Sequence, residues 1–263
     1  MKTYPVLLSF FLVLLFLFSA GCSKENNDPP AARTIQDVEQ DFQALSTSEG
    51  THDVQLEFLN STVWNFRIIA PKVLPGETKP LVIHLHGASG GDPDAHKATA
   101  CYVEPGFENL DAFIISPNGG TKLWYDLSNQ EQVINLTLLA KKYWPVDPDK
   151  IVVMGYSNGG NGSWFFGETQ PTLYSAAIPV ATAYSTIHTN GSVRVMPNPM
   201  YVIHGEQDEL FPLAQTQDWV QKTIDAGSDV TFVVAPGLSH YAPCDYVPYI
   251  KDAVEWLKND VWK

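Results

Sequence analysis

Positive charge is scarce in this sequence, and so is cysteine. The 263 residues include 16 Lys and Arg against 29 Asp and Glu, for a net charge of −13, and they include only three Cys. Nucleic acid and anionic lipid headgroups are themselves negative, so this charge excludes both as main partners. Hydrophobic residues still make up 44% of the chain, which is enough for a sizeable core and excludes wholesale disorder.

The start of the sequence lacks an apolar run long enough to cross a membrane. Residues 6–18 form an almost wholly apolar run of 13 residues, whereas a spanning helix needs about 20. The run ends in small residues before Cys22 and resembles a lipoprotein signal peptide, in which the Cys is lipidated and becomes the mature N-terminus. We therefore expect a signal peptide over residues 1–21, lipidation at Cys22, a polar tether over residues 22–33 and one domain over residues 34–263. The alternative is ordinary cleavage, with Cys22 a bystander.

A lipidated Cys22 predicts a place in the bacterial cell envelope, as an outer-membrane lipoprotein. Contact with the membrane is then expected only through the lipid anchor. Residues 23–28 (SKENND) resemble the short Lys-plus-acidic tag that exports some lipoproteins to the cell surface, and the alternative is a plain tether. The sequence says nothing about the oligomeric state.

Strand and helix patterns alternate along the rest of the chain. Two apolar-rich runs, over residues 54–58 and 63–70, flank Asn60 and Ser61 and predict an antiparallel hairpin. Further strands are expected over residues 81–85, 112–116, 151–154, 176–181, 200–204 and 230–235. Helices are expected over residues 130–142, 210–226 and 249–262. The alternation predicts the α/β class, with a mostly parallel sheet covered by helices on both faces.

Ser157 follows the strand expected over residues 151–154 and lies within the sequence GYSNG. G-x-S-x-G between a strand and a helix is typical of a sharp turn that lifts a nucleophilic Ser above the sheet edge, where the small Gly155 and Gly159 avoid backbone clashes. The turn also places Ser157 at a helix N-terminus, where N–H groups favour developing negative charge. The alternative is a Gly-rich turn without chemistry.

The loop after the strand at residues 81–85 is rich in glycine, with the sequence HGASGG. Such a loop exposes backbone N–H groups, and we expect those of Ala88 and Asn158 to bind an oxyanion. His84 and His86 are two residues apart and share a face of the expected strand, which raises a metal site as an alternative. Two ligands do not make a site, and no further ligand follows at close spacing, so we expect neither metal nor cofactor.

A carboxylate and an imidazole follow the last two expected strands. Asp208 and His240 each lie a few residues beyond a strand end, although each alone is more typical of a surface group. Asp208 is the first choice for the acid and Glu206 the second. With Ser157 they run in the order Ser, Asp, His, which matches the α/β-hydrolases and differs from chymotrypsin and subtilisin. The remaining His outside the Gly-rich loop are expected at the surface: His52, His96, His188 and His204.

Residues 79–258 resemble the carboxylesterase-like branch of the α/β-hydrolases. The motifs that carry the resemblance are LVIHLHG, VDPDKIVVMGYSNGG, AAIPV, IHGEQD and GLSH. This branch includes feruloyl and acetylxylan esterases, polyhydroxybutyrate-depolymerase-like proteins and predicted peptidases. The resemblance implies an α/β-hydrolase fold and a Ser-His-Asp triad of Ser157, His240 and Asp208 that works through an acyl-enzyme without a cofactor.

Substrate contacts are expected from aromatic residues at the same sheet edge. Trp124 and Tyr125 follow the strand at residues 112–116, where aromatic rings stack on sugar or phenolic groups, and Tyr156 precedes the nucleophile. The alternative for Trp124 is packing beneath its own loop. The stretch over residues 182–199 is short, which favours an open site without a large lid.

These patterns favour a secreted, lipid-anchored serine esterase. Its expected substrates are small or polysaccharide-linked carboxylic esters, such as acetyl or feruloyl groups on plant polysaccharide. Two alternatives stay open: a serine peptidase of the same fold, and a catalytically silent surface lipoprotein that binds glycan or protein.

We also expect a disulfide between Cys101 and Cys244. Lipidation of Cys22 leaves these two as the only thiols, and export puts them in an oxidising compartment. Cys101 is expected on the first helix and Cys244 in the loop that follows His240. In an α/β-hydrolase the first and last helices cover the same face of the sheet, so the two segments approach. The alternative is two unrelated thiols.

Overall fold

The computed structural model describes residues 32–263. The expected signal peptide, Cys22 and nearly all of the tether lie outside the described residues. Arg33–Lys263 form one compact unit. Within the part of the chain that the structure describes, no helix is both long enough and apolar enough to cross a membrane.

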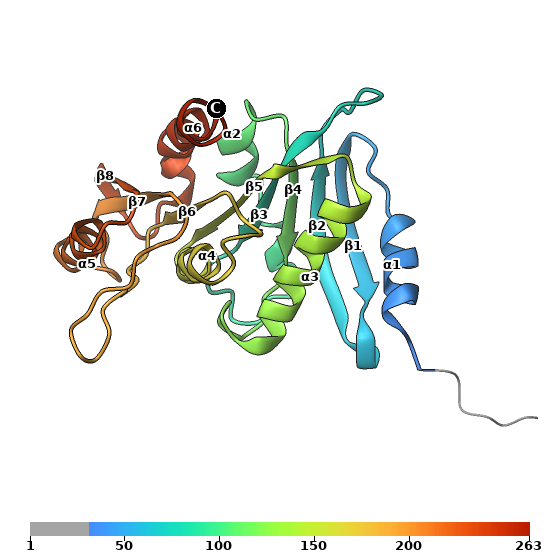
Figure 1. The fold of residues 1–263 in the computed structure, drawn as a ribbon, viewed down its shortest axis with the longest axis horizontal. Helices are drawn as coiled ribbons and strands as arrows, with labels where there is room; N and C mark the ends of the chain where they lie inside the picture. Colours follow the sequence, from blue (N-terminus) through green and yellow to red (C-terminus); the bar gives the residue numbers. More distant parts are fainter. Residues whose placement is uncertain (1–31) are drawn as a thin grey trace, which may run out of the picture. The chain divides into compact units, whose positions relative to one another are not determined.

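An eight-stranded sheet forms the centre of this unit, with the strand order β1-β2-β4-β3-β5-β6-β7-β8 (Figure 1). The strands are β1 (Gly50–Glu57), β2 (Val63–Ala70), β3 (Lys79–Leu85), β4 (Phe113–Pro117), β5 (Val146–Tyr156), β6 (Ala176–Val180), β7 (Met200–Gln207) and β8 (Val230–Ser239). The β1–β2 hairpin and its pairing with β4 are antiparallel, and all other neighbours are parallel. The predicted hairpin and mostly parallel sheet are therefore confirmed.

The burial of the strands explains why the central ones are so apolar. β3 lies between two parallel neighbours, and its residues from Leu81 to Leu85 are all buried because helices cover both faces of the sheet. β2, near the edge, instead alternates buried and partly exposed residues. Its inward residues are Trp64, Phe66, Ile68 and Ala70.

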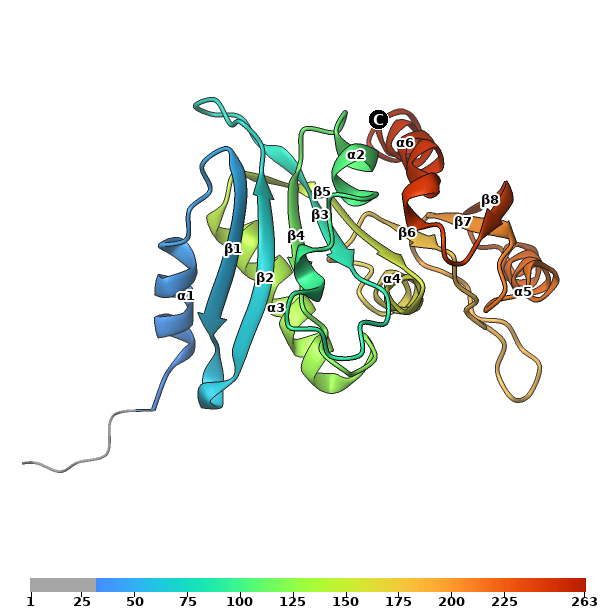
Figure 2. The same cartoon turned by 180° about the vertical axis from the view of Figure 1, so that it is seen from behind.

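Helices cover both faces of the sheet (Figures 1 and 2). One face carries α1 (Ile35–Gln43), α3 (Leu127–Tyr143), α4 (Asn158–Thr169) and α5 (Leu213–Asp225), and the other carries α2 (Val103–Phe107) and α6 (Val247–Trp256). Short 3₁₀ turns lie at Leu59–Ser61, Ala95–Lys97 and Pro243–Tyr246, and a π-helical turn at Leu257–Val261 extends α6. Each face therefore has its own apolar core.

Helix α1 was not among the helices expected from the sequence. It starts at a capping box, in which Thr34 accepts the Asp37 N–H and the Asp37 carboxylate accepts the Thr34 N–H. Val38 and Phe42 point inward, and Phe42 stacks on Trp144. Ile35, Val38 and Phe42 follow the i, i+3, i+7 spacing of one helical face just after the capping box, so the signal for this helix was present in the sequence.

A disulfide joins Cys101 to Cys244, with their Cα atoms 5.0 Å apart. α2 and α6 lie side by side on one face, as Figure 2 shows, which brings the two segments together as expected. The expected place of Cys101 was wrong in one respect. It lies in the turn that precedes α2, because that helix is short and begins only at Val103.

Candidate active site

Ser157 sits at a sharp turn between β5 and α4. Its backbone has φ 56° and ψ −119°, a conformation that L-residues rarely adopt and that the surrounding structure must hold. A Cβ on Gly155 would lie 2.1 Å from the Gly159 carbonyl oxygen, and one on Gly159 would lie 1.8 Å from the Leu85 carbonyl oxygen. Both positions therefore require glycine, as the motif predicts.

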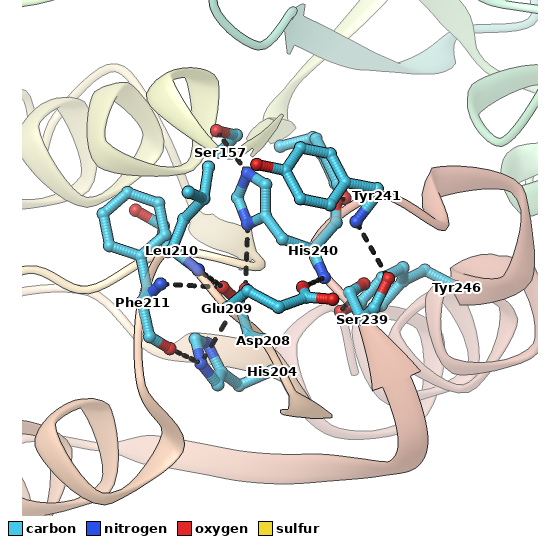
Figure 3. A network of polar contacts seen from close by, with 12 residues as sticks. Ser157, His204, Asp208, Glu209, Leu210, Phe211, Ser239, His240, Tyr241 and Tyr246 are labelled. Atoms are coloured by element: carbon cyan, nitrogen blue, oxygen red, sulfur yellow. Dashed lines mark hydrogen bonds and ion pairs between the residues drawn. The ribbon is translucent and has the colours of Figure 1, made fainter.

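Ser157, His240 and Asp208 form one hydrogen-bonded chain (Figure 3). The Ser157 Oγ lies 3.0 Å from His240 Nε2, and His240 Nδ1 lies 2.9 Å from Asp208 Oδ2. A carboxylate only accepts, so His240 donates through Nδ1 and leaves Nε2 as the acceptor for the Ser157 hydroxyl. The side chains of His240 and Asp208 are buried, which shields their hydrogen bond from water.

Asp208 is held by its own loop as well as by His240. The N–H groups of Leu210 and Phe211 donate to Asp208 Oδ1 at 2.9 and 2.7 Å. Burial alone would raise the pKa of Asp208, but the hydrogen bonds from His240 and the Phe211 N–H outweigh burial and lower that pKa below its usual value. The carboxylate is therefore ionised at neutral pH.

Glu206, the second choice for the acid, does not reach His240. Its Oε2 accepts the Gly237 N–H at 2.8 Å, near the end of β8. The geometry thus separates the two carboxylates, since only Asp208 contacts the imidazole.

Two residues of this network were missed or misjudged from the sequence. Glu209 Oε2 accepts the backbone N–H of His240 at 2.9 Å. His204, expected at the surface, is fully buried beneath Asp208, and its Nε2 donates to the Phe211 carbonyl at 2.7 Å. Burial lowers the pKa of His204 and keeps it neutral. A His at the end of an apolar strand run was the available signal for His204; nothing comparable marks Glu209.

His96 was also expected at the surface and is buried. His84 and His86 do not converge on a common point. His84 contacts Ser116 and Tyr102, each at 2.8 Å, whereas His86 Nε2 accepts the Gly119 N–H. Burial lowers the pKa of His84 to about 3. Among residues 32–263, no group of three or more metal-ligating side chains occurs.

The expected oxyanion donors lie beside Ser157. Asn158 is the first residue of α4, so its N–H has no carbonyl partner within the helix. The Ala88 N–H makes no hydrogen bond within the described residues. Both Ala88 and Ser157 line a cavity of about 390 Å³, whose other walls are Gly87, Tyr156, Leu210, His240, Tyr241 and Pro243. The cavity is open, and its lining is largely apolar.

The three aromatic residues expected to contact substrate have different surroundings. Tyr156 lines the cavity at Ser157, and its hydroxyl donates to the His240 carbonyl. Tyr125 is 41% exposed and lines a second cavity. Trp124 is fully buried, so the expectation that it stacks on substrate was wrong. Its Nε1 donates to the His86 carbonyl at 2.9 Å, which draws the ring beneath the Gly-rich loop.

Comparison with known proteins gives one family match and several relatives. The profile of the Dienelactone hydrolase family matches residues 118–263. Cutinase est1 of Thermobifida alba is 28% identical over 117 residues, which are 44% of this chain and 38% of that protein. Cutinase est2 of the same organism is 30% identical over 44% of this chain and 37% of that protein. The chain thus spans less than two fifths of the length of these two cutinases.

The fold also resembles solved structures. FphF, a fluorophosphonate-binding serine hydrolase of Staphylococcus aureus, superposes with a TM-score of 0.67 at 16% identity, over 81% of this chain and 100% of that one. At this identity the likeness shows a shared fold, the α/β-hydrolase arrangement.

Proposed function

The chain belongs to the Dienelactone hydrolase family, and we propose that it is a serine esterase that hydrolyses carboxylic esters through Ser157, His240 and Asp208. The observation that carries the proposal is the unbroken hydrogen-bonded chain from Ser157 Oγ through both His240 nitrogens to Asp208. A nucleophile, a base and an orienting acid in this arrangement can activate a hydroxyl at neutral pH.

The first half of the reaction makes an acyl-enzyme. Ser157 Oγ attacks the ester carbonyl carbon while His240 Nε2 takes the hydroxyl proton. The carbonyl oxygen becomes an oxyanion, which accepts hydrogen bonds from the N–H groups of Ala88 and Asn158; one such donor is worth about 2.7–4 kcal/mol. The C–O bond to the alcohol then breaks, and His240 gives its proton to the leaving oxygen.

The second half of the reaction regenerates the free enzyme. Water attacks the acyl carbon, His240 takes a water proton, and the Ser157 ester bond breaks to release the carboxylic acid as His240 returns the proton to Ser157. Asp208, kept ionised by its hydrogen bonds, stabilises the imidazolium in both halves.

Ser157→Ala tests the nucleophile directly. Hydrolysis of 4-nitrophenyl acetate and labelling by a fluorophosphonate should both be lost, with unfolding by urea unchanged, since glycines rather than the hydroxyl hold the turn. Ser163→Ala is the matched control, because the Ser163 hydroxyl bonds only to the carbonyls of Gly159 and Gly160 within α4. Unchanged turnover in purified Ser157→Ala contradicts the proposal.

The substrates we propose are acyl esters of plant polysaccharide, such as acetyl or feruloyl groups. Support comes from the open cavity at Ser157 and from the absence of a large lid between β6 and β7. A panel of acetylated xylan, methyl ferulate and short-chain nitrophenyl esters identifies the acyl group. Turnover of nitrophenyl esters alone would contradict the polysaccharide assignment.

We also propose that Cys22 carries a lipid anchor that holds the enzyme in the outer membrane. The support is the sequence pattern of residues 6–22. Cys22→Ala should move the protein from the membrane fraction to the soluble fraction without a change in kcat, because the anchor acts only through its acyl chains. Full retention in the membrane fraction would contradict this anchor.

A further inference from the structure

A second cavity of about 450 Å³ lies on the α4 side of Ser157. Its lining comes from the loop after β4, from α4, from the segment after β6 and from α5. The residues are Tyr125, Asn161, Phe165, Ala183, Tyr184, Ser185, Arg194 and Trp219. Half of them are aromatic, and none takes part in the Ser157–His240–Asp208 chain.

Asn161 connects this cavity to the nucleophile. It lies four residues after Ser157, about 6 Å along the helix axis, and its N–H donates to the Ser157 carbonyl at 3.1 Å. The Thr182 hydroxyl donates to Asn161 Oδ1 at 2.6 Å, which leaves the Nδ2 end of the amide as a donor. The part of the cavity at Asn161 therefore lies one helical turn of α4 from Ser157.

Two of the four aromatic side chains in the lining are fixed by packing, and the other two are partly exposed. Tyr184 is stacked on Trp164 with a ring angle of 3°, and Phe165 packs against Tyr125, so Tyr184 and Phe165 are fixed. Tyr125 is 41% exposed and Trp219 is partly exposed, so these two rings present area that the core does not use. Aromatic rings of this kind bind the apolar faces of ring-shaped ligands.

The polar residues of the lining supply hydrogen-bond donors, but they give the cavity no net charge. Arg194 is paired with Glu168, and its Nη2 also donates to the Ser185 carbonyl at 3.1 Å. Its Nη1 makes no hydrogen bond within the described residues, so Nη1 and Asn161 Nδ2 are both left as donors. Because Glu168 neutralises Arg194, the cavity favours neutral oxygen acceptors over a carboxylate.

We propose that this cavity is a subsite for a neutral sugar ring, the one that carries the scissile ester. Hydroxyl and ring oxygens accept from Asn161 and Arg194, while the apolar face of the ring lies against Trp219. The cavity is open to solvent, which leaves room for the next sugar of a chain. This inference rests on the proposed esterase function and assigns the sugar part of its substrate.

The test compares two acetate esters in matched variants. Trp219→Ala should lower the ratio of kcat/KM for an acetylated methyl β-xyloside to that for ethyl acetate by about tenfold, through KM, because ethyl acetate has no ring to stack on Trp219. Trp219→Phe should restore much of the ratio. Trp256→Ala is the control, since Trp256 is also partly exposed but packs on Tyr201 beneath α6, on the other face.

Two outcomes overturn the subsite. One is a ratio that Trp219→Ala leaves unchanged. The other is a selective loss with methyl ferulate, which would assign the cavity to an aromatic acyl group instead. Binding of xylobiose to Ser157→Ala, compared by calorimetry with Ser157→Ala/Trp219→Ala, decides the subsite without turnover. Hydrolysis that survives in Ser157→Ala would overturn the esterase mechanism alone and leave this binding comparison valid.

Discussion

The two halves of the Ser157–His240–Asp208 chain are held in place by different forces. On the β3 and β5 side, backbone packs directly on backbone, and the Gly159 Cα approaches the Leu85 carbonyl so closely that no Cβ fits. On the β7 and β8 side, carboxylates hold the end of β8 and the residue after it through hydrogen bonds. Glu209 accepts the His240 N–H, and Glu206 accepts the Gly237 N–H.

This difference predicts different responses to substitution. The space beside Gly159 is too small for a Cβ, so one added carbon must break the turn at Ser157. Hydrogen bonds from separate side chains can be removed one at a time, and the loss of one should weaken the positioning of His240 without abolishing it. We therefore expect abrupt losses on the β5 side and graded losses on the β7–β8 side.

Gly159→Ala should have the largest effect. Its Cβ would lie 1.8 Å from Leu85 O and 2.8 Å from His86 O, both of them backbone atoms, so stability should fall by more than about 4 kcal/mol and activity should be lost. Gly167→Ala in the same helix is the control, because its nearest neighbour is the Ala177 Cβ at 3.0 Å and the expected cost is about 1–3 kcal/mol. Soluble yield and urea unfolding measure both. A Gly159→Ala protein as stable as Gly167→Ala would remove the contrast.

Asp208→Asn should come next, with the fold retained. The amide cannot keep the His240 tautomer that accepts from Ser157, so kcat should fall about 10⁴-fold. Glu206→Gln should change kcat by less than about tenfold, because within the described residues the Glu206 carboxylate is hydrogen-bonded to the Gly237 N–H and not to His240. If Glu206→Gln is the more damaging of the two, the assignment of the acid is wrong.

Removal of the disulfide should affect stability more than chemistry. Cys101 and Cys244 are 143 residues apart in the sequence, and loss of such a cross-link typically costs about 2–5 kcal/mol. The double variant Cys101→Ala/Cys244→Ala should unfold at lower urea, with kcat reduced far less than in Asp208→Asn, since the carboxylate contacts still hold the His240 loop. A reductant should weaken the native protein and leave the double variant unchanged. Equal stability of the two proteins would contradict a stabilising cross-link.

Much of the site could be predicted because parallel strands end at one edge of a sheet. Ser157, Asp208 and His240 each follow an apolar strand run, so the strand pattern alone brings them to the same edge. The order of the three residues then selects the reaction class. The Cys101–Cys244 contact could likewise be predicted, because the first and last helices of this fold cover the same face of the sheet.

The rest depends on loop conformations that no local pattern encodes. Trp124 is buried because its indole N–H reaches the His86 carbonyl, 38 residues earlier in the chain. Trp219 and Tyr125 meet in one cavity although the sequence places them on separate segments. Glu209 looks like any exposed loop acid until the fold brings the His240 N–H to it. Contacts of this kind appear only once the loops are built.

Glu209 gives the smallest and most discriminating prediction. We expect it to act as a positioning residue, because its carboxylate accepts the His240 N–H at 2.9 Å and touches no atom of Ser157. Glu209→Ala should lower kcat by about 5- to 30-fold, the effect of about 1–2 kcal/mol from one hydrogen bond to a charged group, with KM for 4-nitrophenyl acetate little changed. Glu209→Gln keeps an acceptor oxygen and should recover most of the rate. If Glu209→Ala lowers the urea midpoint and leaves kcat intact, the residue only stabilises the loop. If Glu209→Gln is as slow as Glu209→Ala, the negative charge of Glu209 matters rather than its hydrogen bond to His240. The expectation of graded losses on the β7–β8 side would then lose its simplest example.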